Sequence, residues 1–204
     1  MTEPRRYILA LTGPSGVGKS TVRRLVELAL PHQTAGVPII TTRRAKSGDE
    51  GEYIHVESDA FSVLEESGKL AAWTRIPAGT EDRRYGYRLS DIEAIWNAQK
   101  LPIVITERSL LEGLSTSFGR RTILSCGLLP PGKSRRAMLS HLLHRLRHRG
   151  RDSEAQIGDR MRNAEHDLDL LTMEEHLFDV IAVNDRLERL IEELLPHVQR
   201  RLPC

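Results

Sequence analysis

The chain contains few aromatic residues and few cysteines. Phe, Trp and Tyr make up 4% of its 204 residues, so the core must be built mainly from Leu, Ile, Val and Ala. The two cysteines, Cys126 and Cys204, give no disulfide framework and are typical of a protein in a reducing compartment. We therefore expect a cytoplasmic protein.

Long apolar runs and an excess of one charge are also missing. No run approaches the roughly 18 apolar residues of a membrane-spanning helix, so the sequence predicts no contact with a membrane. The apolar run from Tyr7 to Leu11 breaks at Gly13 and is too short for the apolar part of a secretory signal. Thirty basic against 28 acidic residues leave a net charge of +2, which argues against nucleic acid as a partner. A positively charged binding site would therefore have to come from a local cluster of basic residues.

Short apolar runs, typical of buried strands, alternate with segments whose apolar residues recur every three or four positions, as in amphipathic helices. The runs are Tyr7 to Leu11, Ile103 to Ile105, Thr122 to Cys126 and Val180 to Val183. The helical segments are Thr21 to Leu30, Leu110 to Leu114, Ala137 to Arg149, Ile157 to Leu171 and Leu187 to Val198. This alternation predicts an α/β fold, in which helices flank a parallel sheet.

The segment from residue 39 to residue 90 differs from the rest of the chain. It has short strand-like pieces, many glycines and charges, one predicted helix from Asp59 to Ser67, and no long buried run. A second irregular and polar piece, residues 149–155, joins two predicted helices. We predict a single domain, residues 1–204, with a core (1–38 and 91–204), an inserted sub-domain (39–90) and a lid at about 149–160.

The segment Gly13-Pro-Ser-Gly-Val-Gly-Lys-Ser20 matches G-x-x-x-x-G-K-[ST] between a predicted strand and a predicted helix. Glycines permit a left-handed backbone and close approach, so that successive N–H groups can point at phosphate oxygens. We expect Lys19 to neutralise the β- and γ-phosphates and the Ser20 hydroxyl to ligate Mg²⁺, while the following helix adds the positive end of its dipole. The pattern thus predicts a site for ATP and Mg²⁺, although hydrolases and kinases share it. The residues expected to line it are Gly13, Ser15, Gly16, Val17, Gly18, Lys19, Ser20 and Thr21.

Further segments resemble the guanylate kinase family. Residues 41–61, TTRRAKSGDEGEYIHVESDAF, are similar to the family's acceptor-binding segment, T-T-R-x-x-R-x-G-E followed by Y-x-F-V-S. The pieces AAWTR, RRYGY, LPP, HRLRHRGRDSEAQIGDRM and FDVIAVND follow in the family's order, so the resemblance covers nearly the whole chain. It implies an ATP-dependent kinase with a P-loop NTPase core, in which residues 39–90 bind the acceptor.

The resemblance implies that Arg43 grips the phosphate of the acceptor and that Tyr53 and Tyr85 reach the same phosphate through their hydroxyls. Lys46 stands in place of a second arginine, and Asp49 in place of a glutamate. A guanidinium holds phosphate through two parallel hydrogen bonds, whereas a lysine supplies only a point charge. The expected partner is therefore a small molecule that already carries a phosphate. A solvated charged loop is the alternative interpretation of this segment.

The resemblance also implies that Arg145, Arg149 and Arg160 close over the triphosphate and that Asn184 lies near the adenine. Phosphoryl transfer spreads negative charge over the moving group, so catalysis needs positioning and cations rather than a nucleophilic side chain. An ordinary basic helix face and a helix cap are the alternative interpretations of these positions. The expected catalytic residues are Lys19, Arg43, Arg145, Arg149 and Arg160.

The chain departs from the family where the acceptor base is read. Three positions that read the base in the family are changed: a serine is Ile39 here, a glutamate is Ala72, and a serine or threonine is Tyr87. The family also has a pair of aspartates on the central strand, and these are Ile105 and Glu107 in this chain. We expect Glu107 to contact Mg²⁺ or the acceptor, and Tyr87 or Trp73 to stack on the acceptor ring. This chain therefore keeps the family's phosphate-binding residues, whereas the residues that would recognise the acceptor base differ.

Three interpretations of the acceptor site follow. The favoured one is transfer of the γ-phosphoryl group to a nucleoside monophosphate similar to GMP, because Thr41-Thr42-Arg43 and residues 53–61 resemble guanylate kinases. The differences at Ala72 and Glu107 instead resemble the ribose bisphosphate phosphokinases. Non-catalytic guanylate kinase-like modules that bind phosphoproteins form the third group, but they usually lack the P-loop or lid arginines present here. The sequence leaves the oligomeric state open.

Overall fold

The structure is a computed structural model that describes residues 6–46, 49–78, 81–150 and 152–203. Both ends of the predicted domain, residues 1 and 204, and residue 151 of the predicted lid lie outside the described residues. In the described ranges, no helix is both long enough and apolar enough to cross a membrane.

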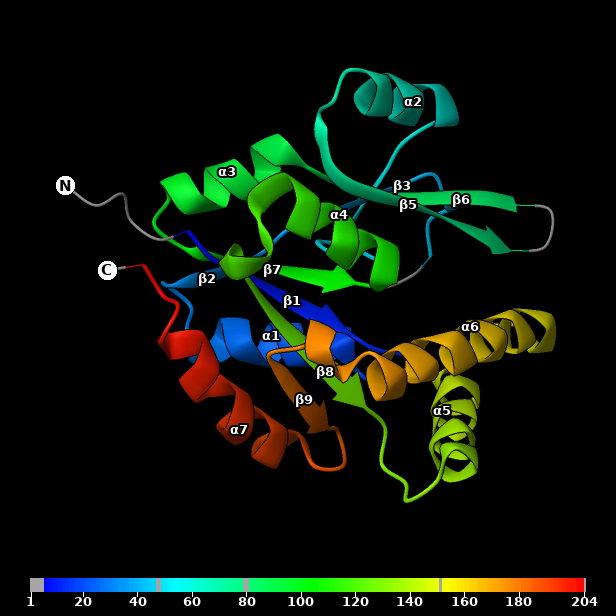
Figure 1. Cartoon of the computed structure of the whole chain (residues 1–204). Helices are drawn as coiled ribbons and strands as arrows, with labels where there is room; N and C mark the ends of the chain where they lie inside the picture. The colour runs from blue at the N-terminus through cyan, green and yellow to red at the C-terminus, as the bar shows by residue number, and fades with distance from the viewer. Residues whose placement is uncertain (1–5, 47–48, 79–80, 151, 204) are drawn as a thin grey trace.

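A five-stranded parallel sheet forms the centre of the core, as the sequence predicts (Figure 1). The four predicted apolar runs lie in four of its strands. Every residue of the two central strands β1 and β7 is buried, which explains why their sequences are almost entirely apolar. The fifth strand, at one edge, is only three residues long and was not predicted. In spatial order the strands are β2 (Thr34–Gly36), β7 (Leu101–Thr106), β1 (Ile8–Thr12), β8 (Ile123–Leu129) and β9 (Val180–Val183).

Side chains of β1 alternate between two hydrophobic cores, because successive residues of a strand point to opposite faces. Leu9 and Leu11 lie in the core covered by α1 (Lys19–Ala29) and α7 (Leu187–Gln199). Ile8 and Ala10 lie in the core covered by α3 (Leu89–Asn97) and α4 (Arg108–Phe118). The sheet is thus sandwiched between helices, and its polar loops gather at the carboxyl ends of the strands.

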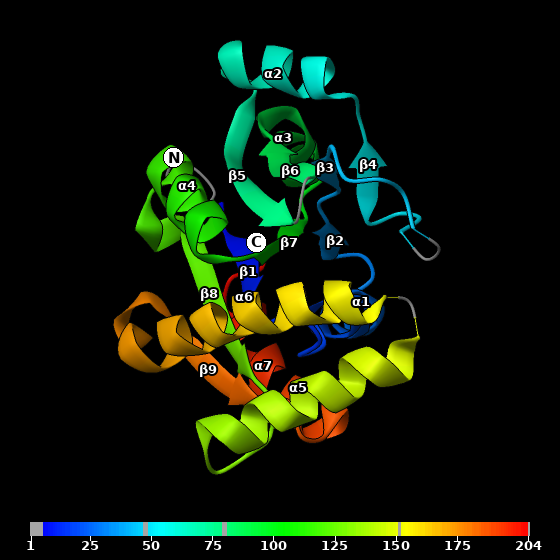
Figure 2. The same ribbon diagram turned by 90° about the vertical axis from the view of Figure 1, so that its right-hand side faces the viewer.

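The segment between β2 and α3 forms a second, four-stranded sheet. Its spatial order is β4 (Tyr53–His55), β3 (Ile39–Thr41), β6 (Glu81–Arg88) and β5 (Leu70–Ala78). The long hairpin of β5 and β6 is antiparallel, and β5 packs on α4, which joins the second sheet to the core. The helix α2 (Ser58–Glu66) lies at its outer end, far from α5 and α6 (Figure 2).

Two helices after β8 lie side by side across the end of the core (Figures 1 and 2). α5 (Arg135–Arg149) is followed by a short connection and by α6 (Glu154–Met173). α6 begins with a capping box, in which Ser153 Oγ accepts the N–H of Gln156 and the Gln156 side chain accepts the N–H of Ser153. These two hydrogen bonds fix the residue at which the connection between α5 and α6 ends and α6 begins. Two short 3₁₀ turns, Arg120–Thr122 and Glu175–Leu177, complete the chain's regular elements in the described residues.

Candidate active site

The glycine-rich loop joins β1 to α1, as predicted. Gly13 has φ +152° and Gly18 has φ +109°, both in the region that favours glycine. A Cβ atom at Gly13 would lie 2.5 Å from the Leu128 carbonyl oxygen, and one at Gly18 would lie 2.6 Å from the Asn184 side-chain nitrogen. Neither position therefore tolerates a larger residue. The loop ends at the first turn of α1, whose free N–H groups favour anions.

Lys19 is the first residue of α1, and its ammonium folds back over the loop. Nζ donates hydrogen bonds to the carbonyl oxygens of Gly13 and, at 3.2 Å, of Pro14. Burial lowers the pKa of Lys19, while the carboxylates of Asp167 and Glu52 act in the opposite direction. The loop thus holds a cation where a phosphate chain would lie.

Arg145 and Asn184 support the backbone of this loop from outside. Arg145 donates from one guanidinium nitrogen to the Val17 carbonyl at 3.1 Å and from the other to the Asn184 carbonyl at 3.0 Å. The buried Asn184 side chain donates to the same Val17 oxygen at 2.7 Å. Both residues lie next to the P-loop and their hydrogen bonds hold its backbone. Their expected roles toward the triphosphate and the adenine stay predictions.

Two further predicted arginines lie at the two ends of the predicted lid, residues 149–160. Arg160 of α6 donates to Ser15 Oγ at 3.0 Å and pairs through Nε with Asp152 at 3.2 Å. Arg149 is exposed at the end of α5, and its charge acts on both Lys19 and Asp152. The structure therefore brings the expected cations of the core and lid together on one side of the P-loop.

The predicted acceptor clamp is assembled around Arg43, a buried arginine two residues after the end of β3. Its guanidinium donates to Asp49 at 2.8 Å and lies over the Tyr53 ring, 4.8 Å from its centroid. Tyr85, on the neighbouring strand β6, interacts with the same guanidinium. Burial raises the pKa of Tyr53 and of Tyr85, so both phenols remain protonated hydrogen-bond donors. Three of the groups expected to grip a phosphate therefore converge.

Asp49 organises this clamp. Its Oδ2 accepts from the Arg43 guanidinium and, at 2.7 Å, from the backbone N–H of Lys46, and it lies 3.2 Å from Nε2 of His55. Burial alone would raise the pKa of Asp49, but the hydrogen bonds from Arg43 and Lys46 lower it below its ordinary value. Asp49 thus orients the arginine. The part played by His55 was not predicted.

Glu52, in the turn before β4, reaches the end of the P-loop; this contact was not predicted. Its Oε1 accepts a hydrogen bond of 2.9 Å from Ser20 Oγ, across 32 positions of sequence. Ser20 is the hydroxyl expected to ligate Mg²⁺. The structure therefore places a carboxylate from the acceptor side next to the expected metal ligand.

Comparisons with known proteins agree with this geometry. A scan against protein-family models finds no match. The guanylate kinase of Synechococcus sp. (strain CC9902) is 29% identical over 200 residues, covering 96% of this chain and 97% of the relative. The guanylate kinase of Nitratidesulfovibrio vulgaris is 31% identical over 195 residues, covering 92% of this chain and 83% of the relative. The chain belongs to the guanylate kinase family.

Solved structures of the guanylate kinase fold are also similar. The crystal structure of guanylate kinase from Anaplasma phagocytophilum covers 97% of this chain and 86% of its own, with a TM-score of 0.65 and 17% identity. The SH3-kinase fragment of tight junction protein 3 covers 100% of this chain and 61% of its own, with a TM-score of 0.51 and 12% identity. At these identities the likeness concerns the fold. The predicted family, fold class and enzyme class, an ATP-dependent phosphotransferase that binds nucleotides, are confirmed.

The structure corrects the expectation for Tyr87, a departure from the guanylate kinase pattern. Its side chain is fully buried, and its hydroxyl donates to the Ile105 carbonyl and accepts the Ile105 N–H. No face of the ring is free to stack on an acceptor. Ile39 and Ala72, the other two departures, are each 4% exposed and belong to the same apolar cluster as Tyr87. A Cβ atom on Gly113 of α4 would lie 2.9 Å from Ala72 Cβ, so helix and strand approach closely here.

Glu107 follows β7 and caps α4. Its two carboxylate oxygens accept the backbone N–H groups of Leu110 at 2.8 Å and Ser109 at 3.0 Å. Asp167 of α6, which no motif marks, lies close enough to interact with Glu107 and Lys19. Burial raises the pKa of Asp167 to about 6, with Lys19 acting in the opposite direction and Glu107 in the same one. The role predicted for Glu107 toward Mg²⁺ or the acceptor stays a prediction.

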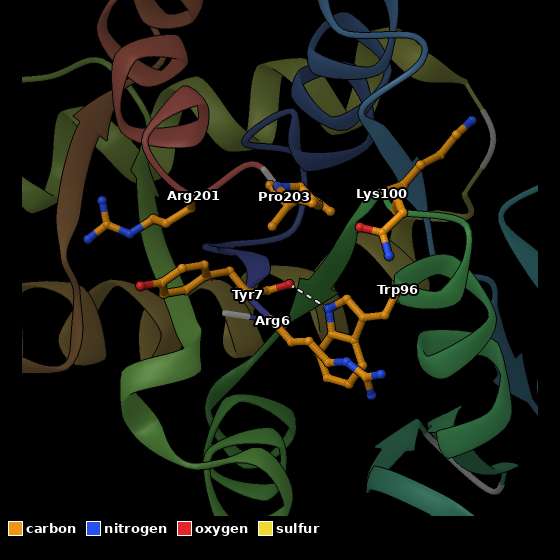
Figure 3. A pocket seen from close by; sticks show the side chains of 8 residues that line it. Arg6, Tyr7, Trp96, Lys100, Arg201 and Pro203 are labelled. Atoms are coloured by element: carbon orange, nitrogen blue, oxygen red, sulfur yellow. Dashed lines mark hydrogen bonds between the residues drawn. The ribbon is translucent and has the colours of Figure 1, made fainter. Parts of the chain in front are cut away.

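A small cavity at the other end of β1 is separate from this site (Figure 3). It has a volume of about 30 Å³, far below the roughly 300 Å³ or more of pockets that hold small molecules. Trp96 donates to the Tyr7 carbonyl at 2.9 Å, and Arg6 and Arg201 lie over the rings of Trp96 and Tyr7. These contacts tie the chain before β1 to α3 and to the segment after α7.

Proposed function

We propose that this chain transfers the γ-phosphoryl group of ATP to a nucleoside monophosphate, and that GMP is an acceptor. The observation that carries the proposal is the convergence of two phosphate-binding sets, one around Lys19 and Arg160 and one around Arg43. Relatives named guanylate kinase, similar over more than nine tenths of this chain, support the choice of acceptor.

The residues present fit ATP and Mg²⁺. The loop from Gly13 to Gly18 supplies backbone N–H donors and Lys19 a cation for the triphosphate. No cluster of three or more His, Cys, Asp and Glu side chains that could hold a metal is found in the described ranges. Mg²⁺, however, is commonly held by one or two protein oxygens together with substrate phosphates. The Ser20 hydroxyl is the oxygen donor proposed to hold it, with Glu52 as the hydrogen-bond partner of that hydroxyl, and the ion would neutralise charge on the phosphates.

The protein's own part in the reaction is binding and orientation. Arg43, Tyr53 and Tyr85 would hold the acceptor phosphate, so that an oxygen of that phosphate faces the γ-phosphorus. Lys19 and Arg160 would stabilise the charge that develops on the transferred group. We propose that residues 39–90 bind the acceptor and that residues 149–160 act as a lid over the core, which excludes water and so prevents hydrolysis of ATP. Both small-molecule substrates are in keeping with a cytoplasmic location.

We propose that the site discriminates only weakly between the bases of different nucleoside monophosphates. Ile39 and Ala72 offer no polar side-chain atoms, and the Tyr87 hydroxyl is fully engaged by Ile105. An apolar pocket separates similar ligands only by roughly 10- to 200-fold, because no buried polar group is left unpaired by the wrong base. We therefore expect other nucleoside monophosphates to be accepted within about 100-fold of GMP.

A panel of acceptors tests this proposal. The purified chain is incubated with ATP, Mg²⁺ and GMP, dGMP, AMP, CMP, UMP or ribose 1,5-bisphosphate, and the release of ADP is followed. Release of ADP with GMP, at a rate well above that without acceptor, supports the proposal. Release with ribose 1,5-bisphosphate alone, or with no member of the panel, contradicts it.

A further inference from the structure

One carboxylate connects the acceptor side of the site to the lid. Asp152 lies in the connection between α5 and α6, and its side chain is only 3% exposed. Its Oδ1 accepts a hydrogen bond of 2.7 Å from Nζ of Lys46, and its Oδ2 lies 3.2 Å from Nε of Arg160. Each oxygen of the carboxylate therefore has its own cation, and the two cations come from different segments.

The contacts continue on both sides of Asp152. Arg160 also donates to Ser15 Oγ of the P-loop at 3.0 Å. Lys46, 106 positions from Asp152, uses its backbone N–H to bind Asp49, the residue that holds Arg43. A continuous series of polar contacts thus runs from the acceptor clamp through Asp152 to the P-loop.

The charges explain why the three groups stay together. Burial alone would raise the pKa of Asp152, but the hydrogen bond from Lys46 and the charge of Arg160 lower it below its ordinary value. A buried carboxylate that loses one of its cations is left incompletely paired, which is costly because water does not replace the missing partner. The acceptor loop and the lid are therefore held in place by the same group.

We propose that Asp152 is a positioning residue that couples the acceptor loop to the lid, so that a phosphate bound at one site orders the other. The proposal rests in part on the function proposed above, because Arg160 is assigned there to the transferred group of ATP and Lys46 belongs to the segment, residues 39–90, that is proposed to bind the acceptor. Coupling between two sites in proteins is typically about 5- to 150-fold in affinity. We expect binding of the two substrates to be synergistic, and the synergy to depend on Asp152.

A distance measurement tests the coupling without any substrate. Spin labels are placed on two exposed residues, Ala60→Cys in α2 and Ala155→Cys at the start of α6, in a chain that carries Cys204→Ser. We expect Asp152→Asn to lengthen and broaden the distribution of distances between the labels. Lys46→Met should have the same effect, because it breaks the same pair from the other side. Distributions identical to the parent chain for both variants would overturn the proposal.

A matched control separates this contact from lid ion pairs in general. Arg147 of α5 and Glu154 at the start of α6 form a pair at 3.0 Å, with side chains 57% and 72% exposed. No contact of this pair with the acceptor loop is found in the described residues. Glu154→Gln should therefore leave the distances unchanged. If Glu154→Gln changed the distances between the labels as much as Asp152→Asn does, the loss of any charged group in this region would have the same effect. That result would contradict a specific role for Asp152.

Synergy of binding provides the second readout. The Kd of GMP is measured by calorimetry with and without the ATP analogue adenylyl imidodiphosphate and Mg²⁺. We expect the analogue to tighten GMP binding roughly 5-fold or more in the parent chain, to have little effect in Asp152→Asn, and to act partly in Asp152→Glu. Unchanged synergy in Asp152→Asn refutes the inference. A parent chain that does not bind GMP refutes the proposed acceptor instead, and the distance measurement then decides the role of Asp152.

Discussion

The hydroxyl of Tyr87 makes two hydrogen bonds to one residue of the central sheet: it donates to the Ile105 carbonyl at 2.7 Å and accepts the Ile105 N–H at 2.8 Å. The edge strand β2 ends at Gly36, opposite Ile103, whereas β7 continues to Thr106. In a parallel sheet, Ile105 presents its N–H and carbonyl on the same side as Ile103, where β2 no longer offers partners. Tyr87 takes the place of the missing strand, and so joins the two sheets.

Tyr87→Phe is therefore expected to destabilise the fold. The substitution keeps the ring but leaves the buried N–H and carbonyl of Ile105 without a partner, which costs about 1–3 kcal/mol in the free energy of unfolding. Urea denaturation measures this loss. The control is Tyr7→Phe, because no hydrogen bond of the Tyr7 hydroxyl is found in the described residues. Equal stability of the two variants would mean that the Tyr87 hydroxyl does not join the sheets.

Glu52→Gln is expected to weaken the use of Mg²⁺. The Glu52 carboxylate accepts from the Ser20 hydroxyl, and loss of a partner of a metal ligand typically lowers metal affinity by roughly 10- to 100-fold. Calorimetry with an ATP analogue at increasing Mg²⁺ concentration measures the effect. The exposed neighbour Glu50 serves as the control, and Glu50→Gln should match the parent chain. A Mg²⁺ dependence that is the same in all three chains contradicts the role given to Glu52.

Arg43→Lys is expected to raise the KM for the acceptor without a comparable rise in the KM for ATP. The substitution keeps the positive charge but removes the planar group that can bind phosphate through two parallel hydrogen bonds. We expect an increase of roughly 10- to 100-fold, which corresponds to about 1.4–2.7 kcal/mol. Arg44→Lys, at an exposed position next to it, is the matched control. If the KM for ATP rose as much as that for the acceptor, Arg43 would not be a clamp for the acceptor.

Asp167→Asn is expected to change how stability depends on pH. Burial raises the pKa of Asp167 to about 6 from an ordinary value of 3.8, so the folded chain binds this proton more tightly than the unfolded chain. The contribution to stability is complete below about pH 4 and is lost as the pH rises through 6. The variant should therefore gain about 2–3 kcal/mol over the parent chain between pH 4 and pH 7. Urea unfolding at several pH values checks this, and a constant difference would be incompatible with a raised pKa.

The sequence was sufficient to predict those parts of the fold and site in which one short segment determines both the local structure and the chemistry. The Gly-Lys-Ser motif between an apolar run and a helical pattern located β1, the loop and α1, and the last core strand, Val180–Val183, was predicted with its observed bounds. One strand and one α-helix of the core were missed. β2 has only three residues, and α3 has nine residues and no side chain that caps its first turn, so both lack the usual sequence signals.

The contacts between the acceptor-binding segment, residues 39–90, and the rest of the chain could not be predicted from the sequence. Ser20 and Glu52 are 32 positions apart, and Lys46 and Asp152 are 106 positions apart, so these pairs depend on how the parts of the chain pack together. Tyr87 was assigned to the acceptor because a tyrosine can either stack on a ligand or pack in a core. Its partner is a backbone segment that lacks a neighbouring strand, which only the three-dimensional arrangement reveals.

Transfer of a labelled phosphoryl group tests the central claim most directly. With γ-³²P-labelled ATP, Mg²⁺ and GMP, the parent chain should produce labelled GDP, with little labelled inorganic phosphate because water is excluded. Lys19→Ala should lower the rate of labelled GDP formation by about 100- to 1,000-fold or more, since one preorganised cation is removed from the transferred group. Lys69→Ala, at an exposed position between α2 and β5, should match the parent chain. Labelled phosphate as the main product of the parent chain, or undiminished GDP formation by Lys19→Ala, would contradict the account.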